Sequence, residues 1–385
     1  MAPDRTRAKP APMEIESVRV VRLSVPMSGS FGSAHHRDFT TMESVLVVLD
    51  TGDGVRGVGT ADATPGYSVQ THDDIEASLR SEILPSLLGD PPAHPNGLLA
   101  CLAQFETAPN AACAVEMAYL DAYCRRRGER LTDLLWGTTR RQLPLNGWVG
   151  IGDPGQMADD ARSWKERGYE SLKIKLSGEP IRDIERVRAV CKAVGDSVAV
   201  RADVNAGYTV DEAIRVARAV EDLPVVHLEQ PVAKADLDGL ARVTAATSTS
   251  IMADECIITP ADALDVIRRE AADRIKIKIL RMGGVLRTRQ VLDAAALAGV
   301  ECVLGHGFGL TPATSAELQL AAAHDNVFGP VESVGPLKMT GEPFDSLTIE
   351  AGRATLPDGP GLGIELREGE DALDEYATSA WRITP

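Results

Sequence analysis

Seven ionisable side chains stand at the ends of short apolar runs in the second half of the chain. In chain order they are Lys173, Lys175, Asp203, Glu229, Asp254, Lys278 and His306. From the second lysine onward, neighbouring groups are 24 to 28 residues apart. Such even spacing indicates one functional group per repeating structural unit. Acid, base and metal-ligand chemistry are the roles that suit these side chains.

Three of these groups are carboxylates, and three carboxylates in a water-poor pocket repel one another unless a cation neutralises them. Magnesium is the natural ion, because it prefers oxygen ligands in octahedral geometry and leaves positions for water and a substrate carboxylate. Mn²⁺ is an acceptable substitute. One such carboxylate alone would as readily pair with a lysine or cap a helix. Together, Asp203, Glu229 and Asp254 predict a Mg²⁺ site.

The lysines are the candidate proton carriers. Lys173 and Lys175 are two residues apart, so on a strand both side chains point to the same face, where like charges lower each other's pKa. One of them thereby becomes a usable base. Lys278 ends the sixth apolar run, almost opposite the second in a closed barrel, and would reach a substrate from the other face.

Eight short apolar runs, separated by segments of helical period, must position these groups. The runs are 143–151, 171–177, 198–205, 225–231, 250–255, 274–280, 301–307 and 327–333. Their spacing is typical of parallel βα units, and eight in succession predict a closed barrel, with a doubly wound sheet as the weaker alternative. The carboxyl ends of barrel strands form one mouth, so the functional groups are expected to converge there.

The N-terminal third of the chain shows a different pattern of apolar residues. Residues 13–61 predict a small antiparallel sheet with a loop and an Asp-Gly turn, and residues 74–135 predict helices, because their apolar residues recur at three and four. Residues 347–368 return to strand and turn chemistry and are expected to rejoin the N-terminal sheet. Residues 1–12 are rich in Pro, Ala and Arg and are expected to be a disordered leader.

Composition excludes several classes of function. The 385 residues are 44% hydrophobic and 25% charged, which is globular composition. The net charge of −16 argues against nucleic acid or an anionic membrane as a partner, because the field repels phosphate. Six scattered cysteines without zinc spacing, and the lack of any apolar run of about 18 residues, predict a reduced, cytoplasmic, soluble protein.

Spaced motifs in the second half resemble a known family. KIK at 173–175, DVN at 203–205, EQP at 229–231, ADE at 253–255, and Lys278 followed by MGG at 282–284 resemble the enolase superfamily, specifically the muconate-lactonizing (muconate cycloisomerase-like) subgroup of the mandelate racemase/muconate lactonizing enzyme family. The resemblance extends from Met13 to residue 364. It implies an α/β fold, a modified (β/α)7β barrel of TIM type under an α+β capping domain built from both chain ends. The implied segments are a capping domain at 13–137, a barrel at 143–335 and a C-terminal return at 336–385.

The resemblance also implies residue roles. The three carboxylates would bind Mg²⁺, which holds the substrate carboxylate and stabilises the enediolate formed when the α-proton leaves. Lys175 would be one acid/base, with its pKa depressed by Lys173. Lys278 would be the acid/base, or the cationic support, on the opposite face. The resemblance further implies a homo-oligomer acting on a small carboxylate.

Weaker signals mark candidate substrate-binding residues, namely Asn205, His306, Glu332 and, in the loop 28–40, His35, His36 and Arg37. His306 either binds substrate or acts as an acid, unless its role is structural. Glu332 either holds a lysine in place or binds a substrate cation or hydroxyl. The loop either covers the barrel mouth as a lid or is a solvated loop.

Departures from the family patterns narrow the function. His306 lacks the strand-six Asp partner of the mandelate-racemase subgroup, and residues 332–334 lack the Asp-x-Asp of dipeptide epimerases. The Pro-Gly-Asp of succinylbenzoate synthases and acylamino-acid racemases is also missing at 328–330. We therefore predict Mg²⁺-dependent α-proton abstraction by a racemase, an epimerase or a lactonizing cycloisomerase. The alternatives are a dehydratase that eliminates water, a Schiff-base lyase using Lys175 or Lys278, and a non-catalytic relative.

Overall fold

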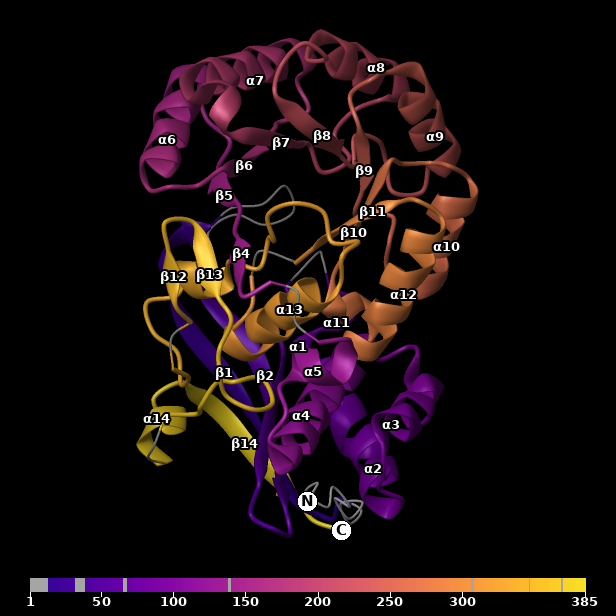
Figure 1. Cartoon of the computed structure of the whole chain (residues 1–385), viewed down its shortest axis with the longest axis vertical. Coiled ribbons are helices and arrows are strands. Elements are labelled where there is room, and N and C mark those ends of the chain that lie inside the picture. Colours follow the sequence, from indigo (N-terminus) through magenta and orange to yellow (C-terminus); the bar gives the residue numbers. More distant parts are fainter. Residues whose placement is uncertain are drawn as a thin grey trace, which may run out of the picture.

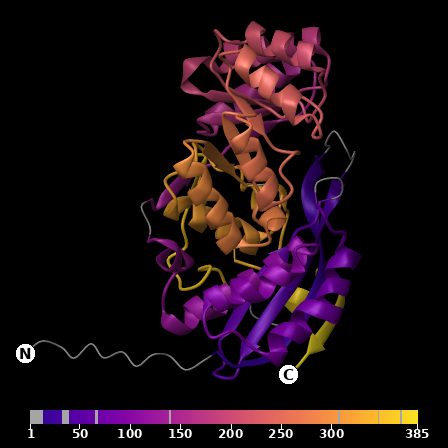
Figure 2. The same cartoon turned by 90° about the vertical axis from the view of Figure 1, so that its right-hand side faces the viewer.

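A computed structural model of the chain describes residues 13–31, 39–64, 68–137, 140–305, 308–345, 347–367 and 370–385. Figure 1 shows a ring of strands and helices above a long antiparallel sheet that packs with its own helices. Figure 2 shows the same two layers from the side. The predicted leader at 1–12 lies outside the described residues, and the predicted domain limits stay a prediction.

The antiparallel sheet has four strands in the order β14, β1, β2, β3. Their bounds are Ala377–Ile383, Ile15–Phe31, Phe39–Thr51 and Arg56–Ala61 respectively. The predicted Asp-Gly turn joins β2 to β3, with Gly54 at φ +80° and its N–H donating to the Thr51 carbonyl at 2.8 Å. The N-terminal sheet predicted from residues 13–61 is therefore confirmed, and β14 adds a fourth strand to it.

Helices follow this sheet in the chain, as predicted, and they also cover it. They are α1 (His72–Ser78), a π-helical turn (Leu79–Ile83), α2 (Leu84–Gly89), α3 (Pro95–Leu102), α4 (Pro109–Arg127) and α5 (Leu131–Leu135). The long helix α4 lies directly on β3, because Gly57 and Gly59 carry no side chain and a Cβ atom at either would overlap α4 backbone. This close contact buries α4 along most of its length.

Seven parallel strands form the curled sheet of the barrel, in chain order from β5 to β11. They are β5 (Gly147–Val149), β6 (Ser171–Lys175), β7 (Ala199–Asp203), β8 (Val225–Glu229), β9 (Ile251–Ala253), β10 (Arg274–Ile277) and β11 (Glu301–Leu304). The helices α6 (Pro154–Glu166), α7 (Pro180–Val194), α8 (Val210–Ala219), α9 (Leu237–Ala246), α10 (Pro260–Arg268), α11 (Ile279–Met282), α12 (Val285–Leu297) and α13 (Thr311–Ala323) follow the strands in turn. The α/β barrel predicted from the eight apolar runs is confirmed.

The eighth apolar run differs from the expectation of a regular strand. Residues 327–333 make only isolated parallel bridges, one from Val327 to Cys302 of β11 and one from Val331 to Leu145 beside β5. Pro330 has no N–H to donate, and Gly329 at φ +58° turns the backbone, so no regular ladder forms. The segment nevertheless closes the ring, because it contacts the last strand at one end and the first at the other.

The C-terminal region corrects a second expectation. The segment predicted at 347–368 does not rejoin the N-terminal sheet in its described part, 347–367, because β12 (Ile349–Glu350) and β13 (Arg353–Thr355) pair with β4 (Gln142–Pro144) instead. The turn between β12 and β13 has Ala351 and Gly352 at positive φ. The first apolar run thus splits into β4 and β5, and β14 is the strand that returns to β1.

One buried carboxylate joins the sheet-covering helices to the barrel. Glu116 of α4 accepts hydrogen bonds from the N–H groups of Val285 and Leu286, which begin α12. Gly284, the last residue of the MGG motif, allows this approach, because a Cβ atom there would overlap the Glu116 carboxylate. Burial raises the pKa of Glu116 to about 8, although the two N–H groups oppose the shift.

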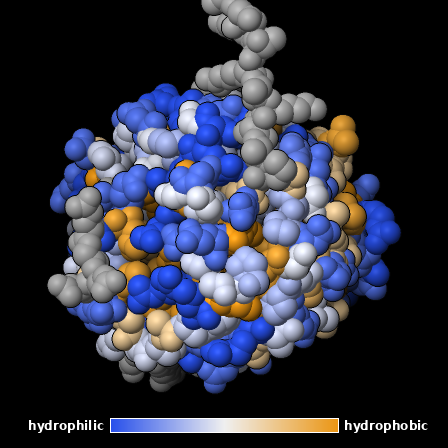
Figure 3. All heavy atoms as spheres, turned by 90° about the horizontal axis from the view of Figure 1, so that it is seen from below, coloured by the Kyte–Doolittle hydropathy of each residue, from blue (hydrophilic) through white to orange (hydrophobic). Residues whose placement is uncertain are grey.

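The described part of the chain contains no helix with the length and apolar character needed to cross a membrane. The face seen in Figure 3 is mostly hydrophilic, and its apolar residues lie in separate patches.

Candidate active site

The strand ends bring the predicted functional groups together at one mouth of the barrel. In the parallel ladder Lys175 is in register with Asp203, and Asp203 is in register with Glu229. Asp254 follows β9 directly, and Lys278 follows β10 directly. Residues in register on neighbouring strands face the same side of a sheet, so the barrel fold itself produces this convergence.

The two lysines of β6 contact the carboxylates of β7 and β8. The Lys173 Nζ lies 2.9 Å from the Asp203 Oδ2 and donates to the Glu229 Oε1 at 2.7 Å. The Lys175 Nζ donates to the Asp203 Oδ2 at 2.6 Å and to the Asn205 Oδ1 at 2.8 Å. Lys173 therefore bridges two carboxylates, whereas Lys175 is held at the edge of the cluster.

Lys278 occupies the other side of the cluster. Its Nζ donates to both carboxylate oxygens of Asp254, at 2.6 and 2.8 Å. Arg281, which the sequence analysis missed, donates to the Asp254 Oδ1 at 3.0 Å and to the carbonyl of Ile257 at 3.1 Å. Because Arg281 is buried on α11, these contacts fix the orientation of Asp254.

The charges shift the proton affinities of the site. Burial would raise the pKa of Asp203, but Lys173 and Lys175 outweigh it and lower this pKa to about 2. Burial and then the Arg281 guanidinium lower the pKa of Lys278 to about 8, although Asp254 opposes them. Burial also lowers the pKa of Lys173, but Asp203 and Glu229 overcome it, and the pKa lies well above its usual value. A neighbouring lysine therefore does not lower the pKa of Lys173 below its usual value, and the predicted lowering of the Lys175 pKa by Lys173 stays a prediction.

The donor set suits a hard divalent cation. Asp203, Glu229 and Asp254 are each at most 3% exposed, and all three offer oxygen ligands. Burial and then the negative charge of Asp203 raise the pKa of Glu229 well above its usual value. This shift is what crowded carboxylates produce, and a cation among them would relieve it. The three residues therefore fit the predicted ion.

A second set of buried charges lies one layer deeper in the barrel. Ligand atoms of His227, Glu229 and Glu332 lie within 4.8 Å of one another, which would also suit a metal. However, Glu332 already receives hydrogen bonds from Lys173 at 3.2 Å, from Arg201 at 3.1 Å, and from Lys276. Three cations at one carboxylate would repel a dication, which counts against a metal at Glu332.

The deeper layer was missed by the sequence analysis, yet a signal for it exists. Arg201, His227 and Lys276 each stand two residues before a mouth residue, as Lys173 stands before Lys175. The period of two in a strand places such residues on the same face, one step further into the barrel. Burial would raise the pKa of Glu332, but Lys173, Lys276 and Arg201 hold it well below its usual range.

The weaker candidates have different outcomes. Asn205, in the left-handed region at φ +47°, lies between Lys175 and Glu255 and donates to the Glu255 Oε1 at 2.7 Å. Glu332 faces the cations of the deeper layer. His306 and the loop residues His35, His36 and Arg37 lie outside the described residues, so their predicted roles stay predictions.

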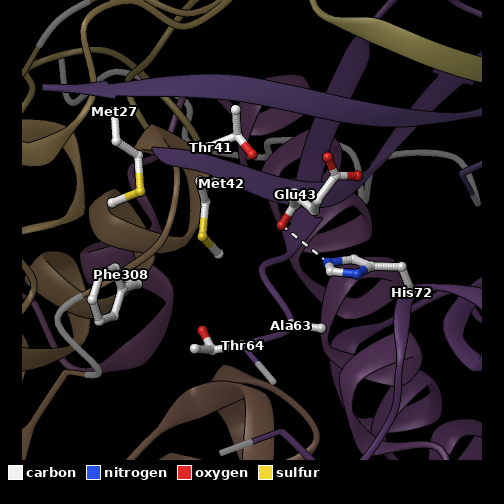
Figure 4. Close-up of a pocket in the computed structure, with 8 residues that line it drawn as sticks. All are labelled: Met27, Thr41, Met42, Glu43, Ala63, Thr64, His72 and Phe308. Atoms are coloured by element: carbon white, nitrogen blue, oxygen red, sulfur yellow. Dashed lines mark hydrogen bonds between the residues drawn. The ribbon is translucent and has the colours of Figure 1, made fainter. Parts of the chain in front are cut away.

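A pocket of about 190 Å³ lies between the antiparallel sheet and the barrel (Figure 4). Its lining residues are Met27, Thr41, Met42, Glu43, Ala63, Thr64, His72 and Phe308. Most come from β1, β2 and the segment after β3, whereas Phe308 follows the barrel strand β11. The His72 Nε2 lies 3.0 Å from the Glu43 carbonyl oxygen, which fixes the imidazole at one side of the pocket (Figure 4).

Comparisons with known proteins agree with this geometry. Residues 13–136 match the family model "Mandelate racemase / muconate lactonizing enzyme, N-terminal domain", and residues 156–370 match "Enolase C-terminal domain-like". The chain is 34% identical over 357 residues to the L-Ala-D/L-Glu epimerase of Bacillus subtilis (strain 168), covering 91% of this chain and 97% of that protein.

Solved structures give the same result. The N-succinyl Arg/Lys racemase from Bacillus cereus ATCC 14579 superposes with a TM-score of 0.89 at 26% identity, covering 96% of this chain and 100% of that one. The muconate lactonizing enzyme from Pseudomonas fluorescens, complexed with muconolactone, superposes with a TM-score of 0.87 at 26% identity, covering 95% and 100%.

Proposed function

The chain belongs to the mandelate racemase / muconate lactonizing enzyme family, and from this premise we propose that it is a Mg²⁺-dependent isomerase that removes the α-proton of a small carboxylate. The three compared relatives are named as an epimerase, a racemase and a lactonizing enzyme, which are all isomerases. Racemisation, epimerisation and lactone-forming cycloisomerisation are the reactions that we rank first.

The observation that carries the proposal is the placement of lysines on two sides of one carboxylate cluster. Lys175 ends β6, and Lys278 follows β10, with three strands between them in the sheet. A substrate carbon held between these amines has one proton acceptor on each face. A two-base inversion of a stereocentre uses this arrangement, because the proton leaves on one side and another returns on the other.

Each residue has a definite task in this proposal. Asp203, Glu229 and Asp254 would hold Mg²⁺, which when bound supplies positive charge to the substrate carboxylate as the α-proton leaves. The Lys175 Nζ would exchange a proton on one face, oriented by Asp203 and Asn205. The Lys278 Nζ would do so on the other face, where its pKa of about 8 lets it donate and accept near neutral pH.

In this proposal the substrate is not a dipeptide with a free ammonium group. Residues 332–334 read Glu-Ser-Val, and the Glu332 carboxylate is engaged by Lys173, Arg201 and Lys276. A carboxylate held by three cations is a poor ligand for a substrate ammonium. The 34% identity to a dipeptide epimerase therefore supports the chemistry rather than the substrate.

Two other mechanisms have weaker support. A dehydratase would use His306 as the acid for the leaving group, and this residue lies outside the described part of the chain. A Schiff-base lyase needs a free amine as nucleophile, whereas Lys175 and Lys278 both donate to carboxylates. We further propose that the protein is cytoplasmic and forms a homo-oligomer. The six free cysteines are consistent with a reducing compartment.

Proton NMR in D₂O with Mg²⁺ tests the function, using a panel of hydroxy acids, N-acyl amino acids, unsaturated diacids and lactones. Loss of an α-proton signal without a new compound indicates a racemase or epimerase, a deuterated lactone indicates a cycloisomerase, and a keto product indicates a dehydratase. Chelation should abolish exchange. Exchange that persists in both Lys175→Ala and Lys278→Ala would contradict the assigned roles, and trapping by borohydride would favour the lyase.

A further inference from the structure

A buried histidine inside the barrel has no role in the mechanism above. His227 lies on β8, two residues before Glu229, so the two side chains face the same side of the strand. The imidazole is 0% exposed. Within the part of the chain that the structure describes, neither of its ring nitrogens has a hydrogen-bond partner. Leaving a buried polar group unpaired costs about 1–3 kcal/mol, so a partner for His227 is expected.

The neighbours of His227 are charged side chains of the deeper layer. In the parallel ladder His227 is in register with Arg201 of β7, and Arg201 is in register with Lys173 of β6. The Arg201 Nη1 donates to the Glu332 Oε1 at 3.1 Å, and the Lys173 Nζ donates to the Glu229 Oε1 at 2.7 Å. Cations therefore hold both carboxylates near the imidazole, whereas no described side chain holds the imidazole itself.

The spacing of three ligand atoms defines a small site. One ring nitrogen of His227, one carboxylate oxygen of Glu229 and one of Glu332 lie within 4.8 Å of one another. Among the described residues, no hydrogen bond joins the imidazole to either carboxylate. Three atoms at that limiting separation share a central point about 2.8 Å from each, which is an ordinary hydrogen-bond length. One atom at that point could bind all three groups.

The chemistry of the three groups matches a water molecule. Water can donate one hydrogen bond to each carboxylate and accept one from the imidazole N–H. Buried waters in proteins typically make about three hydrogen bonds to polar groups that otherwise lack partners. The cations around Glu332 disfavour a dication at this point, and the two carboxylates disfavour an anion.

We propose that His227, Glu229 and Glu332 bind one buried water molecule, through which the imidazole positions the Glu229 carboxylate. The water site stands on the geometry of these side chains. The positioning role rests on the proposed function, in which Glu229 is a ligand of Mg²⁺. Groups that hydrogen-bond to a metal ligand fix its orientation, and their loss weakens metal binding. His227 is thus a positioning residue that acts through Glu229.

A high-resolution crystal structure of the full-length protein with Mg²⁺ tests the water site. We expect one ordered water within hydrogen-bond distance of all three side chains in wild type. His227→Phe keeps a planar ring and removes both nitrogens, so this water should lose occupancy. Lack of an ordered atom at this point in wild type would overturn the proposal. A metal ion there would also overturn it, and Mn²⁺ in place of Mg²⁺ would reveal one by anomalous scattering.

Calorimetric titration with Mg²⁺ tests the positioning role. His227→Phe should bind Mg²⁺ about tenfold more weakly than wild type. His227→Gln retains a hydrogen-bond donor and should recover most of the affinity, which a purely structural role does not predict. His94→Phe, the same substitution at an exposed histidine, is the control and should bind Mg²⁺ like wild type. Unchanged Mg²⁺ affinity in folded His227→Phe would overturn the positioning role.

The outcomes also separate this inference from the proposed function. Thermal unfolding checks that each variant is folded, and a comparison of His227→Gln with His227→Leu replaces His227→Phe if that variant does not fold. If the water is present and Mg²⁺ affinity depends on His227, but no panel compound exchanges its α-proton, the site stands and the proposed reaction fails. If a panel compound exchanges its α-proton but the site holds no water, the function stands and this inference fails.

Discussion

The lysines of the barrel mouth fall into two regions that differ in what surrounds the ammonium. On the carboxylate side, Lys175 and Lys278 each lie 2.6 Å from a carboxylate oxygen. On the aromatic side, Lys338 lies against the rings of Trp148 and Phe308. The first arrangement fixes each ammonium against a carboxylate, as the proposed proton transfer requires. The second holds a buried ammonium against two aromatic faces. The same residue type thus stands in two different surroundings.

The largest effect is expected on the carboxylate side. Lys278→Met should lower the racemisation or epimerisation rate by about a thousandfold, because general acid–base catalysis is worth roughly 10²–10⁴. The enantiomer whose α-proton faces Lys175 should still exchange that proton with D₂O. Proton NMR of the separate enantiomers measures both quantities. Equal loss of exchange for both enantiomers would contradict the proposal that Lys175 and Lys278 each serve one face of the substrate.

On the aromatic side, Lys338 should make the free energy of unfolding depend on pH. The pKa of Lys338 is about 7 in the folded protein against an ordinary value of 10.5, so the unfolded state binds more protons between these values. The free energy of unfolding contributed by this group should therefore rise from pH 7 to pH 10.5, by at most about 1.4 kcal/mol per pH unit. Denaturant titrations of wild type and Lys338→Met across this window measure the difference. Parallel curves for the two proteins would show that Lys338 keeps an ordinary pKa.

The next largest effect is expected at Arg281, whose contact with Asp254 should influence the affinity for Mg²⁺. Arg281→Met removes the hydrogen bond that orients Asp254 while Lys278 remains, and should weaken Mg²⁺ binding by about 10- to 100-fold. Titration of activity with Mg²⁺ measures the affinity. Arg242→Met, at an exposed arginine, is the control. Unchanged Mg²⁺ affinity with lower stability would make Arg281 a purely structural residue.

The smallest effect is expected at Asn205. Asn205→Gly keeps the left-handed backbone and removes one acceptor that holds the Lys175 ammonium. Proton exchange through Lys175 should fall about two- to tenfold, the worth of one hydrogen bond, while exchange through Lys278 should not change. Enantiomer-resolved exchange rates measure this. A loss on both faces would indicate that Asn205 supports the whole cluster.

The convergence of Lys175, Lys278 and the three carboxylates could be predicted from sequence, because each stands at the end of a strand and parallel strands in a barrel share one mouth. Asp203 and Glu229 needed no knowledge of packing. Arg281 could not be predicted, since its contact with Asp254 depends on how α11 turns after β10. Lys338 follows an irregular segment without periodicity, so no pattern indicated its burial. The pairing of β13 with β4 was missed because the sequence of a short strand does not specify which strand it pairs with.

The pairing of β14 with β1 has a consequence for solubility. β1 is long and rich in valine, with Val18 and Val20 paired on one side to β2 and on the other to β14. Without β14, the N–H and C=O groups along that side would form an open apolar edge, which is a template for aggregation. β14 therefore covers the edge of β1. During synthesis this edge of β1 stays unpaired until residues 377–383 have been made and have paired with it.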